Sequence, residues 1–301
     1  MALTINTNIS SLVAQNNLAK ATSSLNTAIE RMTTGYKINH ASDNAAGYSI
    51  ARNWETQLGS LDVAADNAAT GADMLTTLED TYTLVTSHLQ RVRDLTEQAA
   101  NGTYGSQSLK AIESEITARL EEVDRIAANC EFNGLKMMTG TMGDVSIQVG
   151  LYSDEHSRIE LSNTLFEKGD IKSLFENYGT YQDGTKVTDG SKETVARLCA
   201  GLATDGSIAG GQSEMLDAID GVINEISSRV TTLGAAQNRI DSAIESIGVQ
   251  AENITSSLST LRDADIAEES SNYIQAQILQ QAAATLLATA NQTPSIALNL
   301  L

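Results

Sequence analysis

The sequence is poor in residues that interrupt helices and in those that build thick cores. Its 301 residues include one proline and only 4% aromatic residues. Proline breaks the interior of a helix, so a chain with almost none can form very long helices. With so few aromatic rings, the 41% of hydrophobic residues favour thin seams of Ala, Leu, Ile and Val between helices.

The sequence also lacks the residue combinations on which most enzyme and metal sites depend. His40, His88 and His156 are not placed at a metal-ligand spacing, and the motifs HExxH, GxSxG, Walker A and GxGxxG are absent. Cys130 and Cys199 are too few for a disulfide framework and are expected to be buried free thiols. We therefore expect no catalytic residue, no metal site and no cofactor.

Charge is missing from both ends of the chain. No charged side chain precedes Lys20 and none follows Glu269, while the whole chain carries a net charge of -19. The acidic balance argues against nucleic-acid binding, which needs Lys and Arg. The N-terminus has no basic and apolar leader, and no apolar run approaches the ~20 residues of a membrane span. We expect no membrane insertion and, if the protein is secreted, a route without a cleaved leader.

The uncharged ends hold many apolar residues. In the tail LLATANQTPSIALNLL, residues 286–301, six of sixteen residues are Leu or Ile. Burying them yields roughly 10–15 kcal/mol, whereas ordering sixteen residues costs about 1–2 kcal/mol each. We expect ends that are loose in a monomer and ordered in an assembly. The predicted self-assembly core is Ile5, Ile9, Leu12, Leu25, Ile29, Ile274, Ile278, Leu286, Leu287, Ile296, Leu298, Leu300 and Leu301.

Three heptad-like stripes predict a long antiparallel rod of three helices. They run from Trp54 to Ala99, from Leu109 to Ile126 and from Leu216 to Leu261. The first is irregular near Leu78 and Glu79, and the third is interrupted at Gln237. The first and third each span 46 positions, about 70 Å of helix, and equal lengths favour packing side by side. The turn NGTYGS, 101–106, lets the second helix fold back.

The remaining segments complete a mainly α architecture. Segments 1–42 and 262–301 are predicted to pair as a terminal two-helix coiled coil, joined to the rod by the non-helical link GYKINHASDNAAGYS, 35–49. The rod comprises 43–165 and 212–261, with a β-hairpin formed by VSIQV, 145–149, and RIEL, 158–161. Residues 166–211, with Asp-Gly turn signals at Asp183 and Asp189, are expected to form a small cap or an irregular connection.

Several long motifs resemble bacterial flagellin. They are MALTINTNISSLVAQNNL, SDNAAGYSIA, LQRVRDLTEQAANGT, EITARLEEVDRIA followed by EFNGLKMM, and DADIAEESSNYIQAQILQQAAATLLATANQ. The resemblance covers roughly residues 1–150 and 212–301 and goes beyond what heptads alone indicate. It implies a subunit that polymerises into the helical flagellar filament for motility. The termini then form an inner domain around a central channel, the rod forms an outer tube, and the short central insertion leaves the outer domain reduced or missing.

The resemblance also implies partners. Flagellins leave the cell unfolded through the flagellar type III apparatus, a cytoplasmic export chaperone holds their C-terminal segment, and they meet the filament cap and hook-associated junction proteins. LQRVRDLTEQ resembles the segment recognised by the vertebrate Toll-like flagellin receptor. By position Arg91, Leu95 and Gln98 match that hot spot, with Gln90 and Glu115 nearby. The alternative is that Leu95 is rod packing and Arg91 a solvated or intersubunit charge.

Three other functions remain open at this stage. A hook-filament junction protein shares related termini but would form a short ring and should lack the extended match in the LQRVRDLTEQ and EFNGLKMM blocks. A secreted enzyme on a flagellin frame needs a catalytic central insertion, for which 166–211 is short and poor in His. The third of these functions is a ligand or adhesin that does not polymerise.

Overall fold

The computed structural model describes residues 8–176, 191–203 and 207–298. The chain divides into two compact units, residues 60–249 and residues 1–59 with 250–301. The divisions fall inside the two longest helices, α2 (Ala45–Ala100) and α6 (Gln212–Arg262). The predicted domain boundary at 42/43 instead falls in the break before α2, and that at 261/262 falls inside α6, next to its last residue.

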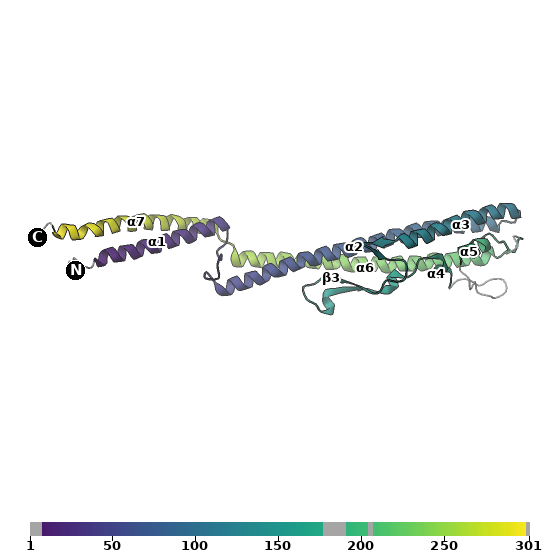
Figure 1. Ribbon diagram of the computed structural model, residues 1–301, viewed down its shortest axis with the longest axis horizontal. Coiled ribbons are helices and arrows are strands. Elements are labelled where there is room, and N and C mark those ends of the chain that lie inside the picture. The colour runs from purple at the N-terminus through teal and green to yellow at the C-terminus, as the bar shows by residue number, and fades with distance from the viewer. Residues whose placement is uncertain (1–7, 177–190, 204–206, 299–301) are drawn as a thin grey trace. The chain divides into compact units, whose positions relative to one another are not determined.

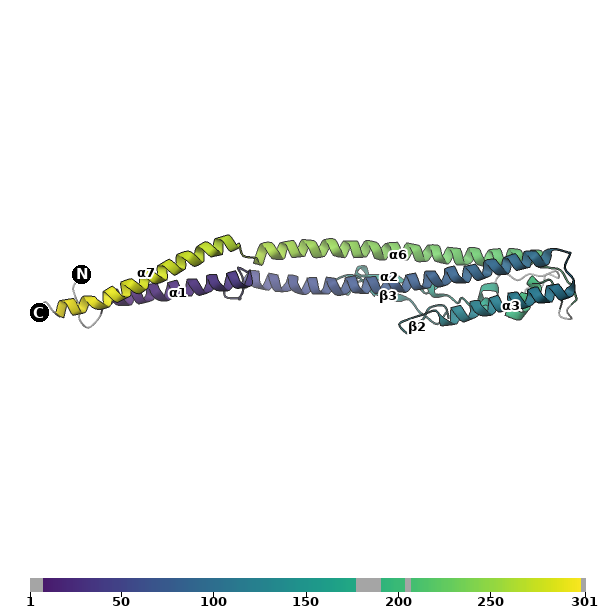
Figure 2. The same ribbon diagram turned by 90° about the horizontal axis from the view of Figure 1, so that it is seen from above.

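The unit 60–249 is built around three helices. α2 and α6 lie side by side (Figure 2). They run in opposite directions, because Arg93 pairs with Asp220 at 2.6 Å, while Glu79, earlier on α2, meets Gln237, later on α6. The shorter α3 (Ser106–Asn129) turns back along α2 after the break at 101–105. The buried core includes every position of the second stripe and most of the first, whereas several positions of the third, such as Ile223, Val230 and Ile244, are only partly buried against it. The predicted antiparallel three-helix rod is confirmed.

The irregular positions of the two long stripes meet each other. Gln237 donates from Nε2 to Oε2 of Glu79 at 2.8 Å. An amide at a seam position is costly unless it is hydrogen-bonded, and the carboxylate beside the gap in the other stripe provides that bond. The pair therefore favours one axial register of α2 against α6, as a polar residue in a heptad seam does in coiled coils.

Two hairpins follow α3. β3 (Val145–Gln148) pairs antiparallel with β4 (Arg158–Leu161), and a short 3-10 turn, η1 (Glu155–Ser157), precedes β4. This hairpin was predicted. β1 (Glu131–Phe132) and β2 (Leu135–Lys136) form a second one, which the sequence analysis missed. Its signal was Asn-Gly: Asn133 and Gly134 have φ of 49° and 83°, as a tight type I′ turn requires.

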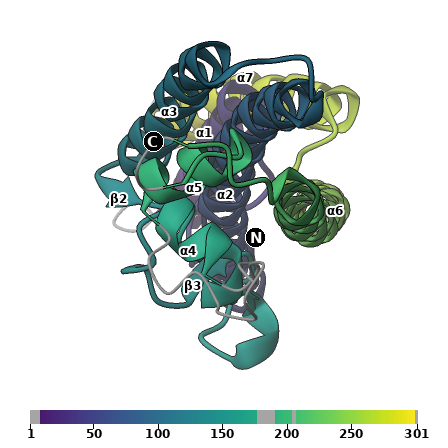
Figure 3. The same cartoon turned by 90° about the vertical axis from the view of Figure 1, so that its right-hand side faces the viewer.

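Residues 163–211 belong to the core of this unit where the structure describes them. η2 (Asn163–Phe166), α4 (Ile171–Phe175) and α5 (Lys192–Cys199) bury apolar side chains in the same cluster as the rod helices. Seen end-on, α4 and α5 lie beside α3 (Figure 3). Asp124 of α3 accepts the backbone N–H of Ile171 at 2.9 Å. The predicted turns at Asp183 and Asp189 lie outside the described residues.

The second unit is a two-helix coil with its linkers. α1 (Ile9–Thr34) and α7 (Ile266–Leu298) lie side by side (Figure 1). The linkers 35–44 and 263–265 are hydrogen-bonded to each other, since the Ala264 N–H donates to the Gly35 carbonyl at 2.8 Å. The predicted non-helical link was too long at its C-terminal end. Asn44 accepts the N–H of Gly47 at 2.9 Å, which caps a helix beginning at Ala45.

Both cysteines are buried free thiols, as predicted. Burial raises the pKa of the Cys130 thiol, and complete burial raises the pKa of Cys199 to about 12. Because the thiolate is the reactive form, both groups are protected from alkylation and disulfide exchange while the rod is folded. Surface cysteines added by mutation would react first.

The packing of β3 on α2 predicts opposite effects for two glycine substitutions. A Cβ at Gly71 would lie 2.3 Å from Cδ1 of buried Ile147, whereas a Cβ at Gly234 of α6 meets nothing within 4 Å. Gly234→Ala should stabilise the rod by about 0.5–1 kcal/mol through its helix propensity. Gly71→Ala should destabilise it by roughly 1–3 kcal/mol through overpacking. Urea unfolding followed by circular dichroism measures both, and equal shifts would contradict the tight contact.

Candidate assembly surface

The α1/α7 coil is closed by alanines. Ala14, Ala21 and Ala28 of α1 recur every seven residues and are buried, as are Ala276 and Ala283 of α7. Side chains this small let two helices approach closely, and a seven-residue spacing keeps one face toward the partner. The helices therefore pair through their smallest residues, with little side-chain volume between them.

Polar contacts fix the register of this coil. Arg31 pairs with Glu269 at 3.1 Å at the base, and Gln280 donates to Oγ1 of Thr22 at 3.2 Å halfway along. Asn8 donates from its side-chain amide to the Ala290 carbonyl at 2.7 Å near the other end. Glu269 is 7% exposed. Burying a carboxylate is costly unless it is paired, so a shift of register that breaks this ion pair is disfavoured.

The large aliphatic side chains lie outside the seam. Ile9, Leu12, Ile29, Ile274, Ile278 and Leu286 are all exposed, with Ile9 at 66% and Leu286 at 63%, and only Leu25 and Leu287 are half-buried. The predicted self-assembly residues that the structure describes therefore do not form the seam of the coil, which alanines occupy. Ile5, Leu300 and Leu301 lie outside the described residues, and the structure does not describe the side chains of Ile296 and Leu298.

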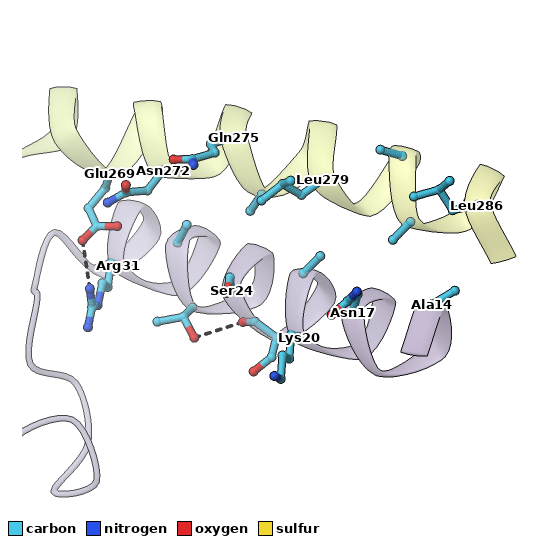
Figure 4. Close-up of a pocket in the computed structure, with 17 residues that line it drawn as sticks. Ala14, Asn17, Lys20, Ser24, Arg31, Glu269, Asn272, Gln275, Leu279 and Leu286 are labelled. Carbon is cyan, nitrogen blue, oxygen red and sulfur yellow. Dashed lines mark hydrogen bonds and ion pairs between the residues drawn. The ribbon is translucent and has the colours of Figure 1, made fainter. Parts of the chain in front are cut away.

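A groove runs along the junction of the two helices (Figure 4). It encloses about 720 Å³ and is lined by alanines, two leucines and short polar and amide side chains, with one cation, Lys20, away from the Arg31–Glu269 pair. A smaller apolar hollow lies on α7 between Ile274 and Ile278. The coil thus presents a groove and uncovered aliphatic side chains, and exposed apolar patches mark protein interaction sites.

The linkers below the coil contain contacts that the sequence analysis missed. The guanidinium of Arg262 lies 4.0 Å from the centre of the Tyr36 ring and forms an ion pair with Glu55. The backbone N–H groups of His40 and Asn39 lower the pKa of Asp43. Arg262 follows directly after the last residue of the predicted stripe. Hydrophobic periodicity therefore could not predict its contacts with Tyr36 and Glu55.

The second predicted surface lies on α2 and α3. Arg91 donates from Nη2 to Oε1 of Glu115 at 2.9 Å, with the two side chains 46% and 41% exposed. Gln90 is exposed, and the exposed Gln98 donates to the Tyr104 hydroxyl at 3.1 Å. Leu95 differs from these residues, since it is 1% exposed and belongs to the rod core. The structure therefore brings Arg91 and Glu115 together and places the Leu95 side chain inside the rod.

The described residues offer little for other chemistry. They hold no group of three or more His, Cys, Asp or Glu side chains placed to bind a metal ion. Within the same residues, no helix has the length and hydropathy that crossing a membrane requires.

Comparisons with known proteins cover most of the chain. Residues 5–142 match the bacterial flagellin N-terminal helical region, and residues 216–301 match the bacterial flagellin C-terminal helical region. The chain is 36% identical to a flagellin of Xenorhabdus nematophila and 32% identical to flagellin A of Vibrio anguillarum, over the full length of both partners in each case. Polar flagellin F of Vibrio parahaemolyticus is 31% identical, again over the full length of both.

The fold is also similar to a solved structure. A putative flagellar hook-associated protein from Vibrio parahaemolyticus superposes with a TM-score of 0.57 at 13% identity. The match covers 73% of this chain and 100% of that one. At this identity the likeness concerns the fold alone.

The alanine seam predicts that size, and not polarity, limits position 21. Ala21→Leu should destabilise the coil by roughly 1–3 kcal/mol, since Ala21 is 8% exposed and three more carbons overpack the close approach of α1 and α7. Ala19→Leu makes the same change at an exposed position of α1 and should leave stability nearly unchanged. Urea unfolding and limited proteolysis of the monomer measure both. Similar behaviour of the two variants would show that α1 and α7 are not closely packed.

Proposed function

Since this chain belongs to the bacterial flagellin family, whose members are the structural subunits of the flagellar filament, we propose that it polymerises through the exposed faces of its α1/α7 coil. Flagellins are structural proteins and not enzymes, so the chain acts by its shape and its contacts with other subunits. The observation that carries the proposal is the exposure of Ile9, Leu12, Ile274, Ile278 and Leu286 on a coil already closed by alanines. Covering each such side chain contributes about 1.5–3 kcal/mol.

Export is the second part of the proposal. The chain leaves the cell unfolded through the flagellar type III apparatus, with an export chaperone holding the C-terminal segment, and adds to the filament under its cap. Hook-associated junction proteins meet the base of the polymer. The absence of a disulfide among the described residues supports this route, because a covalent loop would obstruct an extended chain in a narrow channel. Uncharged ends support burial in a dense filament core, where charge is costly to desolvate.

Seeded polymerisation tests the filament proposal. Purified chain with fragments of its own filaments should grow long filaments visible by electron microscopy. Ile278→Asp should slow elongation by about tenfold or more, since it replaces buried apolar area with a desolvated charge. The control Ile278→Leu keeps the apolar area and should elongate normally. Short rings in place of filaments would favour a hook-filament junction protein, and normal growth of the Asp variant would remove the α7 face from the assembly surface.

We also propose that the monomer is a ligand of the vertebrate Toll-like flagellin receptor, through Gln90, Arg91, Gln98 and Glu115. Arginines at well-packed positions are frequent binding hot spots, and Arg91 is held in place by Glu115 while remaining half-exposed. Leu95 supports this surface from inside the rod. Its truncation would cost about 2–5 kcal/mol of folding stability and so does not test direct contact.

Binding of the monomer to the purified receptor ectodomain tests this second role. Arg91→Ala should weaken the affinity by about tenfold, the effect of a hot-spot residue worth ~1.4 kcal/mol. Arg52→Ala removes an exposed arginine elsewhere on α2 whose partners, Tyr48 and Glu55, lie on the same helix, and it should bind as wild type. Surface plasmon resonance measures both, and unchanged affinity of the Arg91 variant would remove the claim.

A further inference from the structure

Lys20 is an isolated charge on the terminal coil. Between Ile9 and Ile29 it is the only charged side chain, and residues 270–298 contain none. It is exposed and lines the groove between α1 and α7 (Figure 4). None of the ion pairs among the described residues includes it. In a coil made of alanine, aliphatic and amide side chains, this ammonium needs a separate explanation.

Assembly makes the isolation of Lys20 costly. If neighbouring copies cover this coil, its ammonium loses water, and a desolvated charge without an anion is destabilising. The coil itself offers few anions. Glu269 pairs with Arg31 and Glu30 pairs with His40. Glu268, in the first turn of α7, is exposed, and its carboxylate takes part in no ion pair of the described residues.

Within one chain, Lys20 and Glu268 are too far apart to meet. The contacts Thr22–Gln280 and Arg31–Glu269 place Lys20 level with residues 280–282 of α7. Glu268 lies at least twelve residues from that level, which is about 20 Å at 1.5 Å per residue. A neighbouring coil that runs in the same direction and is displaced by about that distance brings its own Glu268 beside the first copy's Lys20.

We propose that Lys20 of one copy forms an ion pair with Glu268 of a second copy, shifted by about 20 Å along the coil axis. The occupant of this face is a second copy because its exposed aliphatic side chains match the apolar hollow between Ile274 and Ile278 while its Glu268 supplies the missing anion. The inference rests on the filament proposal and specifies which residues face each other. The Lys20–Glu268 pair selects one axial offset between neighbouring copies among the several offsets that apolar contacts alone permit.

Charge reversal tests the pair. Lys20→Glu and Glu268→Lys should each slow seeded elongation by about tenfold, because like charges then face each other, and the double variant should recover to near the wild-type rate. Glu252→Lys reverses another exposed carboxylate of the same compact unit and serves as the control. All variants should keep the wild-type circular dichroism spectrum, since neither side chain contributes to the monomer core.

Two results separate failure of this inference from failure of the filament proposal. If wild-type chain grows filaments but the single variants match Glu252→Lys, or the double variant is no faster than either single one, the pair is wrong and the filament proposal stands. If wild-type chain grows no filaments under any of these conditions, the filament proposal itself fails.

Disulfide trapping provides a second measurement. In Lys20→Cys/Glu268→Cys, a bond within one chain is excluded, since a disulfide needs Cα atoms within about 7 Å and the two positions are about 20 Å apart. Oxidised filaments should therefore give covalent multimers on a denaturing gel. Cys130 and Cys199 are buried and stay out of the reaction. The control Lys20→Cys/Glu252→Cys should give monomer, and monomer from both would overturn the pair.

Discussion

The structure depends on helices that pack against one another through side chains at seven-residue intervals. In the terminal coil this spacing leaves alanine at the seam, so α1 and α7 close on each other while their large aliphatic side chains remain outside. A seam of leucines would have buried those same residues within the subunit and left the coil with a polar exterior. With alanine at the seam, α1 and α7 pair within one chain, but the coil keeps exposed aliphatic side chains that another protein surface can cover.

The rod uses the same spacing for the opposite purpose. Its seams bury leucine, isoleucine and valine between α2, α3 and α6, and α4 and α5 add further apolar side chains to that cluster. A core of this kind is complete within one chain, and its exposed faces are mostly polar and acidic. The central segment, expected from its short length to leave the outer domain reduced or missing, is part of the packing of the rod where it is described.

Charge then limits how copies can meet. A net charge of -19 keeps monomers apart in solution, while the near-absence of charge on the terminal coil removes that repulsion where assembly is proposed to occur. On such a surface a single lysine and a single glutamate have more influence on register than they would among many charges. The Arg31–Glu269 pair has the same effect within one subunit, where burial penalises any shift that separates it.

Much of this could be predicted from the sequence. The three rod helices, their antiparallel order, the β3/β4 hairpin and the buried thiols follow from periodicity, turn residues and composition, because each is specified by residues close together in the chain. The β1/β2 hairpin was also specified locally, by Asn133 and Gly134, although its strands are too short to show an alternating pattern. The start of α2 was missed because the cap at Asn44 precedes a run, AAGYS, that is rich in residues equally common in loops.

The sequence by itself determined the long helices of the rod and of the terminal coil, and that both ends of the chain are uncharged. Only the tertiary structure decided which apolar residues face inward. Ile274 and Leu95 are equally hydrophobic in the sequence, yet one is exposed on α7 and the other is buried in the rod. The reason is that a helix with apolar residues on several faces can bury only the face its partner covers, and the partner of α7 is a helix that approaches along alanines.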